Sequence, residues 1–187
     1  MEVITVDRNG EKKVSIESYE CGERRVVRLT GSINSDMIDK IISKVEYLDS
    51  ISNDDIYIYI NSPGGVVTDG FALIDAVNRL KSNVIYVAQG QAASMAAFIL
   101  ASGKKGNRKA TPNAEIMLHQ VLGGTSGQAS DIELAAKQIK KTKNKINSLL
   151  SEWTGKDFET IEKDTDRDYF MSAKEALAYG IIDEIIT

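Results

Sequence analysis

The segment at residues 90–98, Gly-Gln-Ala-Ala-Ser-Met-Ala-Ala-Phe, constrains the fold most, because it places a serine between two buried elements. Before it, residues 84–87 are β-branched or aromatic and predict a buried strand. After it, residues 95–100 are apolar and alanine-rich, which predicts a buried helix. Backbone N–H groups and the helix dipole would favour a nucleophile at Ser94. A serine at this position is also typical of a plain helix cap, so both interpretations stand.

The rest of the chain alternates short apolar strands with amphipathic helices, as in an α/β domain with a largely parallel sheet. Its 187 residues fit one domain, 1–187. Strands are predicted at residues 25–29, 56–60, 84–87, 115–118 and 181–186, and helices at 35–48, 69–80, 95–100, 130–153 and 172–179. Residues 1–20 mix short apolar runs with charge and are expected to form an N-terminal arm or edge hairpin.

The helix predicted at residues 130–153 is longer than such a sheet requires. Ser130 and Glu133 have the spacing of a capping box at its start, and Ser172 and Glu175 repeat that spacing at the last helix. A projecting amphipathic helix usually packs on another copy of the same chain. The sequence therefore predicts an oligomer.

Composition excludes several classes of protein. The net charge of −4 argues against a nucleic-acid partner, and no apolar run is long enough to span a membrane. The N-terminus lacks the pattern of a signal peptide, and the single cysteine, Cys21, allows no internal disulfide, so a cytoplasmic location is expected. With one histidine and one cysteine, a zinc site built from these residues is excluded, and we expect neither metal nor cofactor.

The single histidine, His119, directly follows the strand predicted at 115–118 and comes 25 residues after Ser94. Both residues could therefore lie at the same edge of the sheet, with His119 as the general base. A hydrogen-bonded core histidine is the alternative. The spacing does not choose the acid that would orient the imidazole, because four aspartates remain candidates: Asp131, Asp164, Asp166 and Asp168.

A Pro-Gly-Gly turn at residues 63–65 separates a predicted strand from a predicted helix, which leaves its N–H groups free to bind an anion. It could supply half of an oxyanion hole, with the N–H of Met95 as the other half. It could equally be a tight turn. A phosphate loop is disfavoured, because Val66 and Val67 stand where lysine and serine or threonine would follow.

Five motifs in order make the chain resemble the proteolytic subunit of the Clp protease, the ClpP family of serine peptidases. They are INSPGG at 60–65, GQAASM at 90–95, PN at 112–113, MLHQ at 117–120 and DTDRD at 164–168. The resemblance extends from about Val26 to the C-terminus. It implies a serine endopeptidase that cuts unfolded polypeptides and needs no cofactor of its own.

The resemblance also assigns individual residues. Ser94, His119 and Asp168 match the family's catalytic triad, and the backbone N–H groups of Gly65 and Met95 match its oxyanion hole. The segments that flank the substrate in the family correspond here to Val66, Val67, Gly123, Gly124 and Thr125.

The fold implied by the resemblance is crotonase-like, with residues 121–153 as a protruding handle segment. In this family, handles interdigitate between two stacked heptameric rings, and the resulting tetradecamer encloses the active sites. Tyr57 and Tyr59 resemble positions where an ATP-driven AAA+ unfoldase hexamer docks. Alternatively, these tyrosines belong to a strand face that packs in the core.

Some positions depart from the family pattern. Val121 stands where a proline commonly follows His-Gln, and Arg79 stands where a docking aromatic is often found. The N-terminus also lacks the usual axial-loop pattern. These departures would suit a divergent paralogue, including a catalytically silent ring subunit paired with an active paralogue. A further alternative within the same fold is a crotonase-type enzyme acting on an acyl-CoA.

Overall fold

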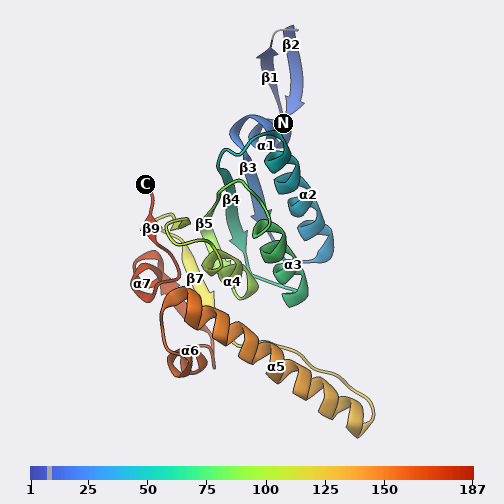
Figure 1. Ribbon diagram of the computed structural model, residues 1–187, viewed down its shortest axis with the longest axis vertical. Helices are drawn as coiled ribbons and strands as arrows, with labels where there is room; N and C mark the ends of the chain where they lie inside the picture. The colour runs from blue at the N-terminus through green and yellow to red at the C-terminus, as the bar shows by residue number, and fades with distance from the viewer. Residues whose placement is uncertain (8–9) are drawn as a thin grey trace.

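The computed structural model describes residues 1–7 and 10–187 of the chain (Figure 1). The strands are β1 (Glu2–Asp7), β2 (Gly10–Ser15), β3 (Val26–Thr30), β4 (Ile56–Ser62), β5 (Val84–Ala93), β6 (Arg108–Ala110), β7 (Glu115–Leu118), β8 (Tyr169–Ser172) and β9 (Glu184–Ile185). The helices are α1 (Ile16–Arg24), α2 (Ser35–Ile51), α3 (Val67–Val77), α4 (Met95–Ala101), α5 (Ala129–Thr154), α6 (Phe158–Asp164) and α7 (Ala173–Tyr179).

The central sheet is mostly parallel and follows the order β3-β4-β5-β6-β9. Strand β5 changes partner along its length: Tyr86 to Ala88 pair with β6, whereas Gln91 to Ala93 pair with β7. Between these two halves, Gly90 has a φ of +91°, a conformation that side chains rarely adopt. The single mixed α/β domain with a mostly parallel sheet is confirmed. The strand expected to end before Gly90 instead continues to Ala93.

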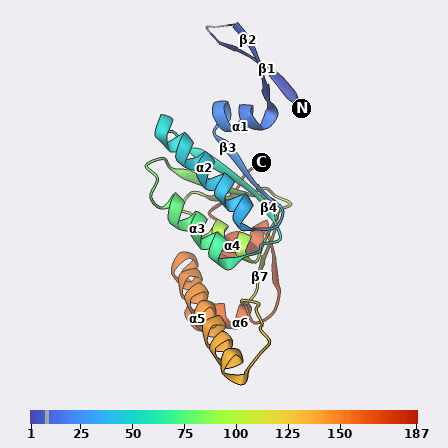
Figure 2. The same ribbon diagram turned by 90° about the vertical axis from the view of Figure 1, so that its right-hand side faces the viewer.

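One face of the sheet is covered by α2, α3 and α4, which pack side by side (Figure 2). Helix α2 begins at the cap Asn34, whose side-chain oxygen accepts a hydrogen bond from the N–H of Met37 at 3.0 Å. Alternate residues of β4 are buried against these helices, as expected for a strand with one covered face. Every residue of α4 is buried, which confirms the helix predicted from the alanine-rich segment.

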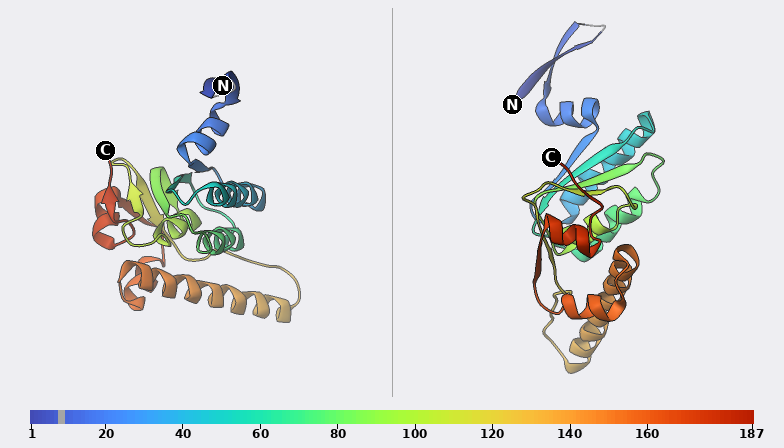
Figure 3. Two further views of the ribbon diagram at one scale, coloured as in Figure 1. Left: turned by 45° about the horizontal axis from the view of Figure 1, so that its top comes forward. Right: turned by 90° about the vertical axis from the view of Figure 1, so that its left-hand side faces the viewer.

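The longest helix, α5, has 26 residues, which corresponds to about 39 Å. It extends away from the sheet, and the segment that follows β7 runs along it to its N-terminal end (Figure 3). The capping box predicted for its start is wrong: within the described residues, the cap is Gln128, which makes no side-chain capping bond. The helix begins two residues earlier in the chain than a cap at Ser130 would require, and Gly155 ends it in a left-handed conformation.

The N-terminal arm is a β1–β2 hairpin followed by α1, and it lies at the opposite end of the molecule from α5 (Figure 1, Figure 2). Residues 8 and 9 of the arm predicted at 1–20 lie outside the described part of the chain. Helix α1 was not predicted, because its residues are mostly polar and none is buried. Within the described residues, no helix combines the length and apolar character needed to cross a bilayer.

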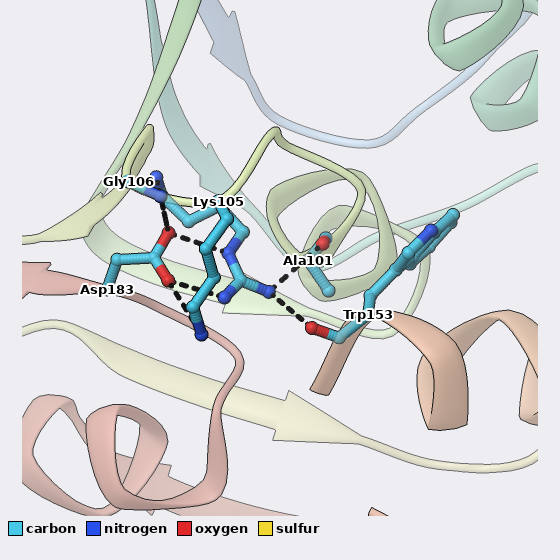
Figure 4. A network of polar contacts seen from close by, with 6 residues as sticks. Ala101, Lys105, Gly106, Trp153 and Asp183 are labelled. Atoms are coloured by element: carbon cyan, nitrogen blue, oxygen red, sulfur yellow. Dashed lines mark hydrogen bonds and ion pairs between the residues drawn. The ribbon is translucent and has the colours of Figure 1, made fainter. Parts of the chain in front are cut away.

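The C-terminal strand β9 has only two residues, not the six predicted at 181–186. Ile181 and Ile182 are buried in the segment between α7 and β9, so their apolar character reflects core packing. The following Asp183 forms an ion pair with Arg108 of β6 (Figure 4). Its carboxylate accepts bonds from Arg108 Nε at 2.8 Å and Nη2 at 2.5 Å, and from the N–H of Gly106 at 2.8 Å.

Burial opposes ionisation of Asp183, but the hydrogen bonds from Arg108 and Gly106 prevail and lower the pKa of Asp183 from 3.8 to about 2. A carboxyl whose pKa is lowered on folding stabilises the folded state above its unfolded pKa, and this contribution is lost as the pH falls. We therefore expect the pair to contribute about 2 kcal/mol above pH 4, and this to disappear between pH 4 and pH 2.

The measurement is urea unfolding of the wild type and the Asp183→Asn variant at several pH values. The difference in free energy of unfolding between them should be largest at pH 5 and shrink towards pH 2. A difference that stays constant over this range would contradict the ionic origin of the stabilisation.

Candidate active site

The carboxyl ends of three neighbouring strands converge at one edge of the sheet. In the register of the sheet, Ser62 of β4 lies beside Ala92 of β5, and Ala93 of β5 lies beside Met117 of β7. Ser94 and His119 follow these strand ends, so the pairing of β5 with β7 brings the serine and the histidine together. The juxtaposition expected from the sequence is therefore present.

Ser94 has an unusual backbone conformation, with φ 54° and ψ −122°. Such a conformation costs free energy and persists only where its surroundings enforce it. Here the N–H of Ser94 donates to the carbonyl of Met117 at 2.8 Å, and the first turn of α4 follows directly. The serine thus occupies a sharp strand-to-helix turn. It is the N-cap residue of α4, but its side chain makes no capping bond within the described residues.

The side chain of Ser94 contacts the imidazole. Its Oγ lies 2.7 Å from Nε2 of His119, a hydrogen-bond distance. Nδ1 of His119 lies 3.6 Å from Oδ1 of Asp168, which is close enough for electrostatic attraction but long for a hydrogen bond. The three side chains form a continuous row from serine to histidine to aspartate.

Asp168 reaches this row because β8 runs antiparallel to β7, with Tyr169 opposite Leu118. The residue before β8 therefore lies next to the residue after β7. The side chain of Asp168 remains 59% exposed. Of the other three candidates, Asp164 accepts a bond from the hydroxyl of Tyr179 at 2.9 Å.

Neither of the remaining two aspartates forms an ion pair with the histidine within the described residues. Asp166 receives the side-chain amide of Gln120, which donates to its backbone carbonyl at 2.8 Å. Asp131 lies in the first turn of α5. Among the four candidates, Asp168 is thus the carboxylate paired with the histidine.

The backbone N–H groups of Gly65 and Met95 are both available beside Ser94. Gly64 and Val66 use their backbone groups to bond Ile33, so the N–H of Gly65 between them points to the opposite side. Met95 is the first residue of α4, whose N–H has no partner within the helix. Neither group donates a backbone bond within the described residues.

A pocket of about 390 Å³ opens beside Ser94 and His119. Apart from these two residues and a few backbone groups, its wall is mainly apolar. The apolar side chains come from α3, α4, β7, the segment after β7, and α5: Val67, Met95, Phe98, Met117, Leu118, Val121, Leu122, Ile146 and Leu150. The sequence did not single out Phe98, Ile146 and Leu150 as site residues, because their apolar character is equally typical of an ordinary core.

Of the two predicted substrate-flanking segments, the pocket wall includes Val67 of the first and Leu122, the residue before Gly123 of the second. Val66 is exposed before α3, and Val67 lines the pocket. Gly123, Gly124 and Thr125 are exposed in the segment between β7 and α5. Their role in holding a substrate stays a prediction.

The predicted docking tyrosines lie elsewhere. Tyr57 and Tyr59 are half-buried on the face of β4 opposite its buried isoleucines, so the alternative that they pack in the core is wrong. The guanidinium of Arg28 lies 5.6 Å from the ring centre of Tyr59 and is paired with Glu20 of α1 at 2.6 Å. Charged groups thus border this surface.

No group of three or more His, Cys, Asp and Glu side chains in the described part of the chain is arranged to hold a metal ion. A serine on a strained turn, a histidine within hydrogen-bond distance, a nearby carboxylate and two free N–H groups define a hydrolase-like arrangement. A model of the Clp protease family matches residues 9–187. The chain belongs to the Clp protease family, which confirms the assignment made from its motifs.

The turn at Ser94 depends on the absence of a side chain at Gly64. A Cβ atom at this position would lie 2.7 Å from Cβ of Ser94 and 2.9 Å from the N–H nitrogen of Met95, and Gly64 has a φ of +94°. We expect Gly64→Ala to displace the serine and lower the rate of its acylation by about 100-fold, since small displacements at reacting atoms have effects of this size.

The measurement is the rate of adduct formation with a fluorophosphonate, followed by intact mass. Gly22→Ala in α1 is the matched control, because a Cβ there meets no atom within 4 Å. Equal labelling rates in the two variants would show that the close approach at Gly64 does not support the turn.

Proposed function

We propose that the protein is a Clp-type serine endopeptidase subunit that hydrolyses peptide bonds of unfolded polypeptides. The observation that carries this proposal is the 2.7 Å contact between Oγ of Ser94 and Nε2 of His119. The family membership supports the same reaction class. A crotonase-type acyl-CoA enzyme could use the paired N–H groups, but it would have no need for a serine bonded to a histidine.

In the proposed reaction, Ser94 attacks the peptide carbonyl while His119 accepts its proton. Asp168 orients the imidazole and stabilises its protonated form. The N–H groups of Gly65 and Met95 bind the oxyanion of the tetrahedral intermediate. His119 then donates the proton to the leaving amine, and water hydrolyses the acyl-enzyme by the reverse sequence of proton transfers.

The proposed substrate is an extended peptide that adds a strand between residues 65–67 and 123–125. Its side chain on the amino side of the cleaved bond would enter the pocket beside Ser94. Because Phe98, Ile146 and Leu150 line this pocket, a large apolar side chain should be preferred over a small or charged one.

The proposed assembly follows from the family and from α5. In this proposal, the fold is crotonase-like, and residues 121–153 act as the handle that joins two heptameric rings into a cytoplasmic tetradecamer, either of this chain alone or with a paralogue. Leu122, Ile132 and Leu134 are exposed on this segment and would be covered in such an assembly. An AAA+ unfoldase would dock near Tyr57 and Tyr59 and supply substrate at the expense of ATP.

A second candidate is a ring subunit that is inactive by itself and is activated by a partner. The separation of 3.6 Å between His119 and the exposed carboxylate of Asp168 favours this candidate, because the aspartate is not held at hydrogen-bond distance. In this case, contact with a neighbouring subunit would bring Asp168 closer to the imidazole.

Replacing the nucleophile tests the reaction. Ser94→Ala is expected to lower hydrolysis of a fluorogenic peptide by about 10⁴-fold or more, as removal of a triad serine does. It should also abolish the fluorophosphonate adduct. Ser43→Ala on α2 is the control, because Ser43 is exposed and does not line the pocket, and it should retain both peptide hydrolysis and the adduct.

The outcomes separate the candidates. Hydrolysis of the peptide by Ser94→Ala at the wild-type rate would exclude the serine mechanism. An absence of adduct on the wild-type protein alone, with an adduct after addition of a paralogue or unfoldase, would support the second candidate.

The proposed handle contact is tested at Leu134, which is 66% exposed on α5. Leu134→Glu should separate the double ring into single rings, because a buried carboxylate would lack a partner at the contact. Sedimentation velocity measures the change in mass. Ile51→Glu on α2 makes the same kind of change on an exposed residue outside α5. Loss of the double ring in both variants, or in neither, would contradict the assignment of α5 as the contact.

A further inference from the structure

A buried cation joins the C-terminal ends of two helices. Arg108 is only 1% exposed, and its Nη1 donates to the carbonyl of Trp153 in the last turn of α5 at 2.9 Å. The same nitrogen lies 3.5 Å from the carbonyl of Ala101, the last residue of α4. Figure 4 shows Ala101 and Trp153 converging from one side and Asp183 lying on the other. A positive charge at a helix C-terminus complements the helix dipole.

Asp183 fixes the orientation of this cation. Its two carboxylate oxygens engage Nε and Nη2 of Arg108, which leaves Nη1 to face the helix ends. The side chain of Asp183 is 9% exposed, so the bidentate pair is largely shielded from water. Such a pair holds the guanidinium in one plane, which a single hydrogen bond would not do.

The two helices joined in this way form much of the pocket beside Ser94. Phe98 comes from α4, and Ile146 and Leu150 come from the C-terminal half of α5. The ring of Trp153 lies 4.7 Å from the ring of Phe98 and packs behind it. The carbonyl and the ring of Trp153 therefore link Arg108 directly to the pocket wall.

We propose that Arg108 and Asp183 are positioning residues that set the width of the apolar substrate pocket by fixing the end of α5 against α4. This proposal rests on the proposed function, in which that pocket receives a substrate side chain. Neither residue touches the substrate. Their effect passes through Trp153 to Phe98, and through the position of α5 to Ile146 and Leu150.

A neighbouring ion pair, between Lys109 and Glu184, provides a matched comparison. Lys109 and Glu184 directly follow Arg108 and Asp183 in the chain, and they also join β6 to β9, at 2.6 Å. In this pair Glu184 is 53% exposed and Lys109 24% exposed, and within the described residues neither side chain forms a hydrogen bond or ion pair with α4 or α5. Glu184→Gln therefore removes an ion pair between these strands without affecting the helix ends.

The experiment measures kcat/KM for two fluorogenic peptides that differ only in leucine or alanine before the cleaved bond. In Asp183→Asn, we expect the ratio of kcat/KM for leucine over alanine to fall about tenfold, mainly through KM for the leucine peptide. Glu184→Gln should keep the wild-type ratio. A general loss of folded protein would lower kcat/KM equally for both peptides and leave their ratio unchanged. An unchanged ratio in Asp183→Asn would overturn the proposal.

A second variant keeps the test valid if Asp183→Asn does not fold. Trp153→Ala leaves the buried ion pair in place but removes the ring behind Phe98, and it should lower the same ratio. A wild-type ratio in Trp153→Ala would overturn the proposal. Fluorophosphonate labelling of Ser94 distinguishes a failure of the proposed function from a failure of the positioning role. A wild-type protein that stays unlabelled even with a paralogue or unfoldase contradicts the proposed function, whereas a labelled protein with unchanged ratios contradicts only the positioning role.

Discussion

The parallel pairing of β5 with β7 is the constraint on which the rest of the site depends. A displacement of this pairing by one residue would turn every side chain to the other face and separate Ser94 from His119. The register is stabilised by the buried side chains of both strands and by the bond from Ser94 to Met117. Gly90 allows β5 to bend from β6 towards β7, so one strand supports both the core of the sheet and the active-site edge.

Helix α4 connects the proposed chemistry with the proposed specificity. Its seven residues span only about 10 Å. Its first N–H lies beside the nucleophile, its middle contributes Phe98 to the pocket, and its last carbonyl faces Arg108. Because all its residues are buried in a close-packed interior, we expect a displacement at one end of this short helix to be transmitted to the other.

The sequence predicted the parts of the structure that depend on local pattern. The buried helix after Ser94 and the capping box of Ser172 with Glu175 both follow from residues close in the chain. Residues that are brought together only by tertiary pairing were harder to predict from the sequence. Spacing alone left four aspartates open, because the choice of Asp168 depends on the antiparallel pairing of β8 with β7, and only the family resemblance pointed to it. The pocket likewise combines helices distant in the chain, whose apolar residues resemble any other core.

The position of Trp153 has a spectroscopic consequence. It is the only tryptophan in the chain, and its indole packs against Phe98, which forms part of the pocket wall. Intrinsic fluorescence excited at the indole therefore originates from one point, at the junction of α4, α5 and the pocket. The protein carries a built-in optical reporter, whose emission maximum and quenching describe the polarity of this junction without any attached dye.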